Sequence, residues 1–251
     1  MKKTKIVIPA LGLLLLSTAA SITGTVAWFA SQATVTATGM SVTVKSDTAF
    51  LLIKAGSAAT AADVRNGGAA SANASTASRQ LLPVAHESAA TTIATTEATT
   101  GEGASATMTN WYYYYSKDPT LSNGGTAGLS DKYNVLSSSF ENYVLANEFN
   151  LTLAEGSSPM NTLRVGHCTI TPTTAKPEAV KVLVATSTAA EEFDGTGADG
   201  STTLQSALTD ETVMQVKVYI YWDGADSDVY TNNIDNLLST SVEITFTGLV
   251  G

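Results

Sequence analysis

The feature of this sequence that most constrains its fold is a series of short segments rich in β-branched and aromatic residues, separated by clusters of Gly, Pro and Asp. In residues 149–153 apolar and polar side chains alternate, which is typical of a strand with one buried face. The same strand character recurs in residues 163–170, 180–186, 212–222 and 241–247. Because little amphipathic helix lies between these segments, the sequence predicts a mainly β fold. We expect an antiparallel, jelly-roll-like β-sandwich with one or two short helices.

Composition excludes several classes of protein. The chain has 251 residues, 44% of them hydrophobic and only 14% charged, which is too apolar for a disordered acidic tail. With 13 Lys and Arg against 22 Asp and Glu, the chain lacks the basic face that nucleic-acid binding requires. Its single cysteine, Cys168, cannot form an internal disulfide. Packing and backbone hydrogen bonds must therefore hold the fold, and we expect Cys168 to be a buried free thiol.

The N-terminal residues have the pattern of a secretory signal peptide. A basic start, MKKTK, precedes an apolar run over residues 6–20, and small residues permit cleavage after Ala20 or Ala27. We favour Ala27, which assigns residues 1–27 to the signal and makes signal peptidase a processing partner. Removing three lysines then takes the formal net charge from −9 to −12. The mature chain is expected to be secreted, extracellular or at the cell surface, without membrane contact.

An uncut signal would change this localisation. Residues 6–29 form an apolar stretch that is long enough to cross a bilayer of about 30 Å. A membrane-anchored envelope protein is therefore the alternative to a secreted one.

The rest of the chain divides into a short N-terminal segment and one domain. Residues 28–46 are expected to form an N-terminal strand segment, because residues 40–44 alternate between apolar and polar side chains. Residues 47–251 are expected to form a single β-sandwich domain, with a short helix within residues 133–146. Within this domain, residues 55–107 are dominated by Ala, Ser, Thr and Gly. This composition predicts a long low-complexity insertion at the surface, which contacts the core near Leu81 and Val84.

One segment concentrates the aromatic residues. Trp111 is followed directly by Tyr112, Tyr113, Tyr114 and Tyr115 on a predicted strand, so the rings alternate between its two faces. One interpretation is that one face packs in the core and the other carries a ladder of tyrosines. The other interpretation is that these five residues form a surface for a carbohydrate or another ligand, or a subunit contact.

Residues suited to catalysis or metal binding are few. The two histidines, His86 and His167, do not share a zinc-binding motif. His167 and Cys168 are neighbours on a predicted strand and point to opposite faces, so they do not easily form a nucleophile pair. We therefore expect no catalytic residues and no enzyme activity. Two glycine-bearing turns are rich in aspartate, whose oxygens suit calcium, although solvated turns are the preferred interpretation. The calcium candidates are Asp194, Asp199, Asp223, Asp226 and Asp228.

Two stretches of the sequence carry a resemblance to a known family. Residues 24–29, GTVAWF, are followed by residues 35–44, VTATGMSVTV. Near the C-terminus, residues 214–220, MQVKVYI, precede an acidic turn, and residues 242–246, VEITF, close the fold. In these stretches the chain resembles the TasA/camelysin family of secreted bacterial biofilm-matrix proteins. It departs from the family pattern at residues 30–32, where Ala-Ser-Gln replaces an acidic residue, and in the insertion at 55–107. Some camelysin relatives are described as proteases, but two histidines do not supply a zinc site, so that activity is not carried over.

The resemblance implies a jelly-roll subunit that assembles into extracellular fibres of the biofilm matrix. The implied mechanism is donor-strand exchange, in which the N-terminal segment freed by cleavage pairs with the open edge of the next copy and builds a head-to-tail homopolymer. The sequence fits this mechanism, because residues 28–45 can extend over about 55–60 Å and begin with two aromatic anchors. The expected polymerisation interface consists of Trp28, Phe29, Val35, Met40, Val42 and Val44.

Two alternatives are open at this point. Residues 35–44 can instead be the first strand of the chain's own sheet. The protein can instead be a cell-surface β-sandwich module that binds a carbohydrate or another ligand through residues 111–115 and the acidic turns.

Overall fold

The computed structural model describes residues 41–46, 50–58, 60–74, 81–115, 131–171, 179–195, 197–226 and 241–250. All of them belong to the unit that spans Ala37–Gly251. The expected signal peptide at 1–27 lies outside the described residues, as do Trp28, Phe29, Val35 and Met40.

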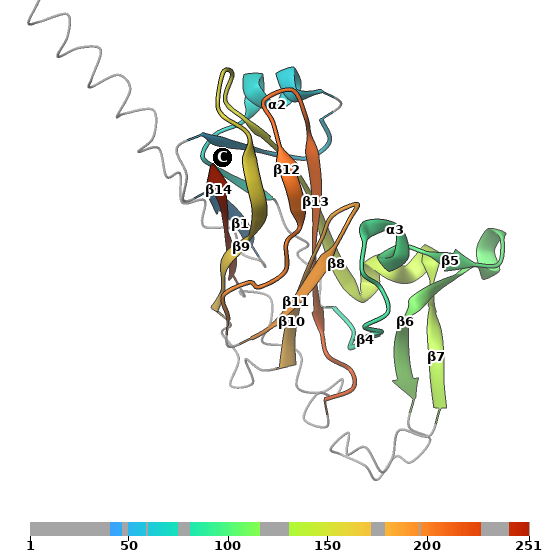
Figure 1. The fold of residues 1–251 in the computed structure, drawn as a ribbon. Coiled ribbons are helices and arrows are strands. Elements are labelled where there is room, and N and C mark those ends of the chain that lie inside the picture. The colour runs from blue at the N-terminus through green and yellow to red at the C-terminus, as the bar shows by residue number, and fades with distance from the viewer. Residues whose placement is uncertain are drawn as a thin grey trace, which may run out of the picture. The chain divides into compact units, whose positions relative to one another are not determined.

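Two five-stranded sheets form a β-sandwich, which confirms the predicted mainly β fold (Figure 1). The first sheet consists, in spatial order, of β12 (Gln205–Leu208), β9 (Met160–Thr171), β14 (Ser241–Val250), β1 (Ser41–Ser46) and β3 (Ser71–Ala74). The second consists of β11 (Ala190–Asp194), β10 (Val180–Ala185), β13 (Met214–Trp222), β8 (Val144–Leu153) and β2 (Leu51–Ala55). Neighbouring strands in these two sheets are antiparallel, except β1 and β14, which run parallel.

Alternating side chains from the two sheets meet in the main hydrophobic core. β13 contributes Val216, Val218 and Ile220, and β14 contributes Ile244 and Phe246. Because strand residues two apart share a face, the sequence alternation seen in these segments becomes one continuous apolar layer between the sheets.

The single cysteine is part of this core. Cys168 is a buried free thiol, as predicted, whereas its neighbour His167 is exposed. Burial raises the pKa of the Cys168 thiol to about 12, so the thiolate is scarce at neutral pH. The residue therefore acts in packing.

A smaller third layer covers the face of the second sheet that points away from the first (Figure 1). Its strands are β4 (Ala85–His86), β5 (Thr99–Thr100), β6 (Thr107–Tyr115) and β7 (Asp131–Leu136). β4, β5 and β7 each pair with β6. Its short helices are α3 (Ile93–Thr96), η1 (Gly103–Ser105) and η3 (Ser137–Asn142). The helix η3 confirms the short helix expected within residues 133–146. The second sheet is therefore buried on both faces, and residues 218–222 of β13 are all buried.

The segment at 55–107 is more structured than its composition suggests. It contains α2 (Ala61–Gly67) and the edge strand β3, as well as β4, α3 and β5. Leu81 and Val84 are buried, which confirms the predicted contact with the core, but Val64 of α2 is also fully buried. Two of the threonines are helix N-caps: Thr60 and Thr92 each accept a hydrogen bond from a backbone N–H in the first turn of a helix. This low-complexity segment therefore contains capped helices. It also contributes more buried side chains to the core than was expected of a surface insertion.

One backbone position in β9 is strained. Thr162 has a φ of 52°, in the left-handed region that β-branched residues avoid. It lies where the pairing of β9 with β14 shifts register between Thr247 and Leu249. The strain accompanies this irregularity at the C-terminal end of β14.

Candidate functional site

The N-terminal strand lies inside the first sheet. β1 pairs in parallel with β14, from Ser41 beside Ser241 to Ser46 beside Phe246, and its other side pairs with β3. Lys45 on the outer face forms an ion pair with Glu243, with 2.6 Å between Nζ and Oε2. Among the described residues, β1 therefore has a partner strand on both sides.

Two residues of the expected polymerisation interface are core residues in this structure. Val42 and Val44 are fully buried and pack with β14 and the second sheet. This arrangement agrees with the alternative interpretation, which made residues 35–44 the first strand of the chain's own sheet; the described strand is Ser41–Ser46, and residues 35–40 lie outside the described residues. Burying each valine side chain stabilises the folded state by about 1.5–3 kcal/mol relative to leaving it exposed to solvent. β1 therefore contributes to the stability of the sandwich.

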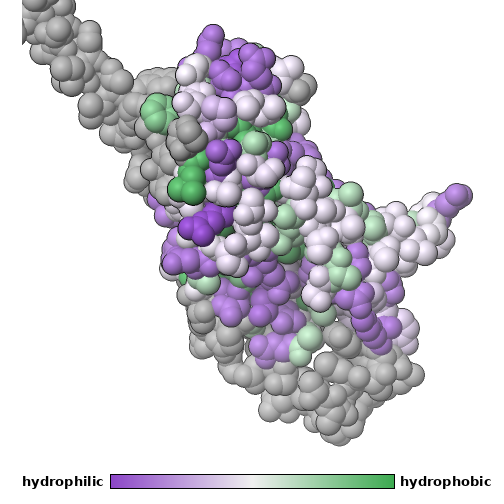
Figure 2. Space-filling model, viewed as in Figure 1, coloured by the Kyte–Doolittle hydropathy of each residue, from purple (hydrophilic) through white to green (hydrophobic). Residues whose placement is uncertain are grey.

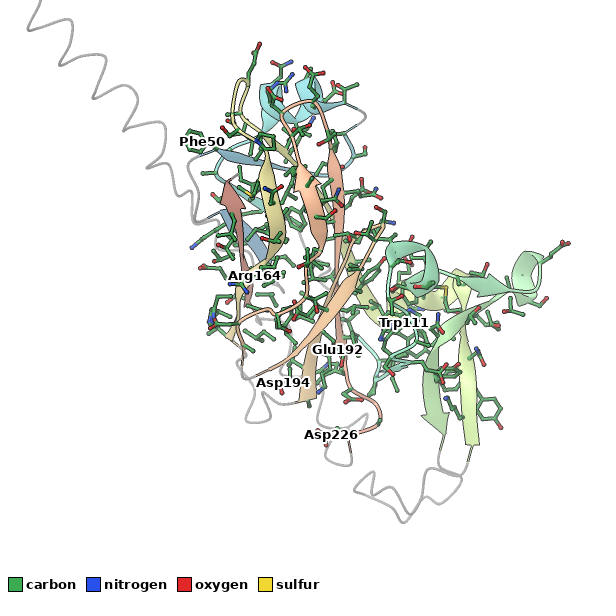
Figure 3. All side chains as sticks on the ribbon, in the orientation of Figure 1. Phe50, Trp111, Arg164, Glu192, Asp194 and Asp226 are labelled. Carbon is green, nitrogen blue, oxygen red and sulfur yellow. The ribbon has the colours of Figure 1, made fainter. Side chains whose placement is uncertain are left out.

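Trp111 belongs to the core and not to a ligand surface. Its side chain is fully buried, and its Nε1 donates a hydrogen bond to the Thr96 carbonyl oxygen at 2.9 Å. The rings of His86, Tyr221 and Phe140 lie 4.6, 5.0 and 5.2 Å from it, measured between ring centroids. The expectation that Trp111 contacts a ligand is corrected for this reason: the third layer and β13 enclose the ring (Figure 3).

The tyrosines after Trp111 are arranged differently from the expected ladder. Tyr113 lies between Tyr133 and Tyr143, with ring centroids 5.6 and 5.9 Å away and the rings nearly parallel. Since residues two apart share a face, this stack continues the face of Trp111 and does not form the opposite one. The side chains of Tyr114 and Tyr115 are not among those described.

Tyr112 is on the opposite face of β6 and is held by polar contacts. Its hydroxyl donates a hydrogen bond to Glu87 Oε2 at 2.7 Å. The ammonium group of Lys132 lies 3.6 Å from the centre of the Tyr112 ring. Tyr112 and Tyr113 therefore make their contacts within the protein.

Hydrogen bonds to a carboxylate connect the third layer to β13, and this contact was not predicted from the sequence. Glu97, at the end of α3, accepts hydrogen bonds from Lys217 Nζ at 2.8 Å and from the Tyr219 hydroxyl at 2.9 Å. Burial, together with the charge of Glu97, raises the pKa of Tyr219 far above its ordinary value. Tyr219 therefore keeps its proton and donates a hydrogen bond to Glu97 between the layers.

A second carboxylate lies further along the same face of β13. The hydroxyl of Tyr221 donates a hydrogen bond to Glu192 of β11, and His86 Nδ1 lies 3.5 Å from the same oxygen, Oε2. Partial burial raises the pKa of Glu192, but the hydrogen bonds from His86 and Tyr221 outweigh it, so the net pKa is below the ordinary value. The sequence did contain a signal, because Lys217, Tyr219 and Tyr221 alternate on one face of a predicted strand and carry polar tips that need acidic partners.

The aspartates proposed for calcium make separate contacts. His167 Nδ1 lies within hydrogen-bond distance, 2.6 Å, of Asp199 Oδ1, and Asp223 lies 3.9 Å from Lys181 and accepts the backbone N–H of Ala225 at 3.0 Å. Asp194 ends β11, Asp226 donates its backbone N–H to the Asp223 carbonyl, and Asp228 lies outside the described residues. In the part of the chain that the structure describes, no three His, Cys, Asp or Glu side chains are grouped to hold a metal ion.

No family model, curated protein or solved structure matches this chain. Within the described ranges, every helix is too short or too polar to cross a bilayer.

Proposed function

We propose that this chain is a secreted, non-enzymatic structural subunit of an extracellular surface fibre or biofilm matrix, and that it assembles by N-terminal donor-strand exchange. The observation that carries the proposal is the position of β1 between β14 and β3. β1 has partner strands on both sides, so the residues that precede Ser41 are attached to an interior strand of the sheet, and they are the part of the N-terminal segment that can be donated. The resemblance to the TasA/camelysin family supports the same assignment, and a jelly-roll order of strands is part of the proposal.

The direction of β1 decides which residues can be donated. Only residues 47–50 connect β1 to β2, so exchanging β1 itself would bring the same end of two copies together. Such an exchange closes into a symmetric pair, whereas a fibre needs a contact between two different surfaces. We therefore assign donation to residues 28–40, which include Trp28, Phe29, Val35 and Met40, and keep Val42 and Val44 in the chain's own sheet.

The composition of residues 28–40 suits a contact between acidic copies. This segment, WFASQATVTATGM, contains no charged side chain, although the chain has 22 Asp and Glu. Docking it on a second copy adds no repulsion between like charges. The aromatic pair can fill apolar pockets, and the β-branched run can form backbone hydrogen bonds, each worth about 1 kcal/mol net.

The first experiment is to express the full chain in a secreting host and to purify the protein from the medium. Mass spectrometry should place the mature N-terminus at Trp28, and negative-stain electron microscopy should show filaments. A start at Met1 would favour the membrane-anchored alternative, and monomers under all salt and pH conditions would reject the fibre.

A pair of variants tests the donor segment itself. Trp28→Ser with Phe29→Ser should leave folded monomers that do not assemble. The matched control, Ser31→Ala with Gln32→Ala, should form filaments like the parent. Filaments from both variants would reject donor-strand exchange.

One observation favours a second function, a cell-surface module that binds a carbohydrate or another ligand. Tyr133, at one end of the stack with Tyr113 and Tyr143, keeps 44% of its surface exposed. An exposed aromatic ring is a common contact for a sugar. Binding to a glycan array that disappears in Tyr133→Ala would support this function, and an array without signal would remove it.

A further inference from the structure

Two large hydrophobic side chains are exposed at one end of the sandwich. Phe50 is 51% exposed and Leu249 is 71% exposed. β1 ends beside Phe246, Phe50 follows shortly before β2, and Leu249 is three residues beyond Phe246, so both lie at the same end. Figure 3 labels Phe50 at the end where Figure 1 marks the C-terminus, and Figure 2 shows strongly hydrophobic residues at the surface there. We call this end, with Phe50 and Leu249, the apolar end.

The backbone of β14 continues past β1 at the apolar end. The pairing of the two strands stops at Ser46 and Phe246, whereas β14 extends to Val250. Among the described strands, none continues the ladder along the β1 side of residues 247–250. A stretch of this kind can accept an added strand through backbone hydrogen bonds.

β1 begins at the end of the sheet opposite to the apolar end. Ser41 lies beside Ser241, at the start of β14, and Leu249 is eight residues further along the strand. At about 3.3 Å per residue, this separates the exit point from Leu249 by about 26 Å. Since β1 runs toward the apolar end, the chain enters β1 at the end opposite to it.

This geometry favours a second copy over the same copy as the partner. To reach its own apolar end, the segment would have to reverse direction and run back along the whole sheet. If the apolar end of a second copy faces Ser41, the segment can reach it in line with β1 and without such a reversal. Residues 28–40 span at most about 43 Å when extended, which is enough for either path, so direction and not length makes the difference.

We propose that Phe50, Leu249 and the edge of β14 at residues 247–250 form the acceptor surface for Trp28 and Phe29 of a second copy. The inference rests on the proposed function and adds the location of the acceptor. Because β1 begins at the end opposite to Phe50 and Leu249, and the proposed donor and acceptor are different surfaces, the contact is heterologous and extends into an open filament.

The charges at the apolar end are consistent with an uncharged occupant. The turns there carry Glu155, Asp210 and Glu211, and the Asp210 carboxylate accepts the backbone N–H of Gly156 at 2.8 Å. An acidic segment would be repelled by these turns. The donor residues 28–40 carry no charge and avoid this cost.

A complementation experiment with secreted full-length protein tests the acceptor. The acceptor variant, Phe50→Ser with Leu249→Ser, changes exposed side chains and should stay folded, which circular dichroism checks. It should remain monomeric, and so should the donor variant, Trp28→Ser with Phe29→Ser. A mixture of the two should form dimers with one copy of each variant, detected by size exclusion with light scattering, because only one productive contact exists between them.

The outcomes separate the two proposals. If the parent protein does not assemble, the proposed function fails. If the parent assembles and the acceptor variant forms the same filaments, only the acceptor assignment fails. The control variant, Leu82→Ser with Leu136→Ser, removes exposed side chains of similar size elsewhere and should assemble like the parent. If the mixture of the donor variant and the acceptor variant stayed monomeric, or formed filaments, the acceptor assignment would also be overturned.

Discussion

Val44 of β1 lies beside Ile244 of β14, and both side chains are fully buried. This pair joins the first and the last described strands, so residues from both ends of the chain complete the first sheet. The N-terminal strand therefore has two effects. Its valines fill the core, and its direction fixes the end of the first sheet at which the chain enters β1.

Shortening Val44 should destabilise the fold. Val44→Ala leaves a cavity between the sheets and should lower the free energy of unfolding by about 2 kcal/mol, measured by urea denaturation. Thr43→Ala, on the outer face of the same strand, is the control and should change it by less than about 0.5 kcal/mol. Equal effects of the two substitutions would show that β1 does not pack as described.

Neutralising Glu97 should loosen the third layer. Glu97→Gln weakens the hydrogen bonds to Lys217 and Tyr219 and should cost about 1–2 kcal/mol. Hydrogen exchange should become faster for the amides of β6 while those of β14 keep their protection. Glu102→Gln, on an exposed residue before η1, should change neither. Unchanged exchange in β6 after Glu97→Gln would mean that this carboxylate does not hold the layer.

The contacts of Glu192 should make stability depend on acid pH. Its pKa is lower in the folded chain than its ordinary value of 4.5, so the ionised form stabilises the fold above that pH. This stabilisation is lost as the pH falls through the folded pKa. The difference in unfolding free energy between the parent and Glu192→Gln should therefore shrink from pH 6 to pH 3.

Asp223 provides a comparison of opposite sign. Burial raises the pKa of Asp223, so its protonated form is favoured in the folded chain. Relative to Asp223→Asn, the parent should gain stability as the pH falls. For each variant the measured quantity is the difference in unfolding free energy from the parent. If both differences changed with pH in the same direction, these two assignments would be contradicted.

Relieving the strain at Thr162 should stabilise the protein. A β-branched residue in the left-handed region costs about 1–2 kcal/mol, and the Thr162 side chain is exposed, so little packing is lost on replacement. Thr162→Gly should raise the free energy of unfolding by up to about 1 kcal/mol and raise Tm. Thr169→Gly, at an exposed position in the same strand, should lower both. A loss of stability from Thr162→Gly would indicate that the strain is absent in solution.

The strands were predictable from sequence because their alternation is local. Residues 241–247 show the period of two that the half-buried first sheet imposes, whereas residues 149–153 and 218–222 have the strand character expected from the sequence but are buried on both faces. The buried thiol of Cys168 and the contacts of Leu81 and Val84 follow from the same reasoning. These features depend on side-chain polarity and not on knowing which strands are neighbours.

The features that sequence did not predict depend on tertiary neighbours. One interpretation of residues 111–115 placed one face of this strand in the core, and Trp111 agrees with it, but the local run of aromatic residues did not show that the third layer and β13 enclose this ring. Glu97 and Glu192 meet β13 from distant segments of the chain. The helices α2 and α3 in the low-complexity segment were not predicted, because threonine is common both in loops and at helix N-caps.

A disulfide trap tests head-to-tail assembly most directly. In a chain that carries Phe29→Cys and Leu249→Cys, oxidation should link residue 29 of one copy to residue 249 of the next, while the buried Cys168 takes no part. We predict a ladder of dimers, trimers and longer oligomers on a non-reducing gel, which collapses on reduction, with the 29–249 crosslink identified by mass spectrometry. Monomers that contain an internal 29–249 disulfide, or no disulfide at all, would contradict it.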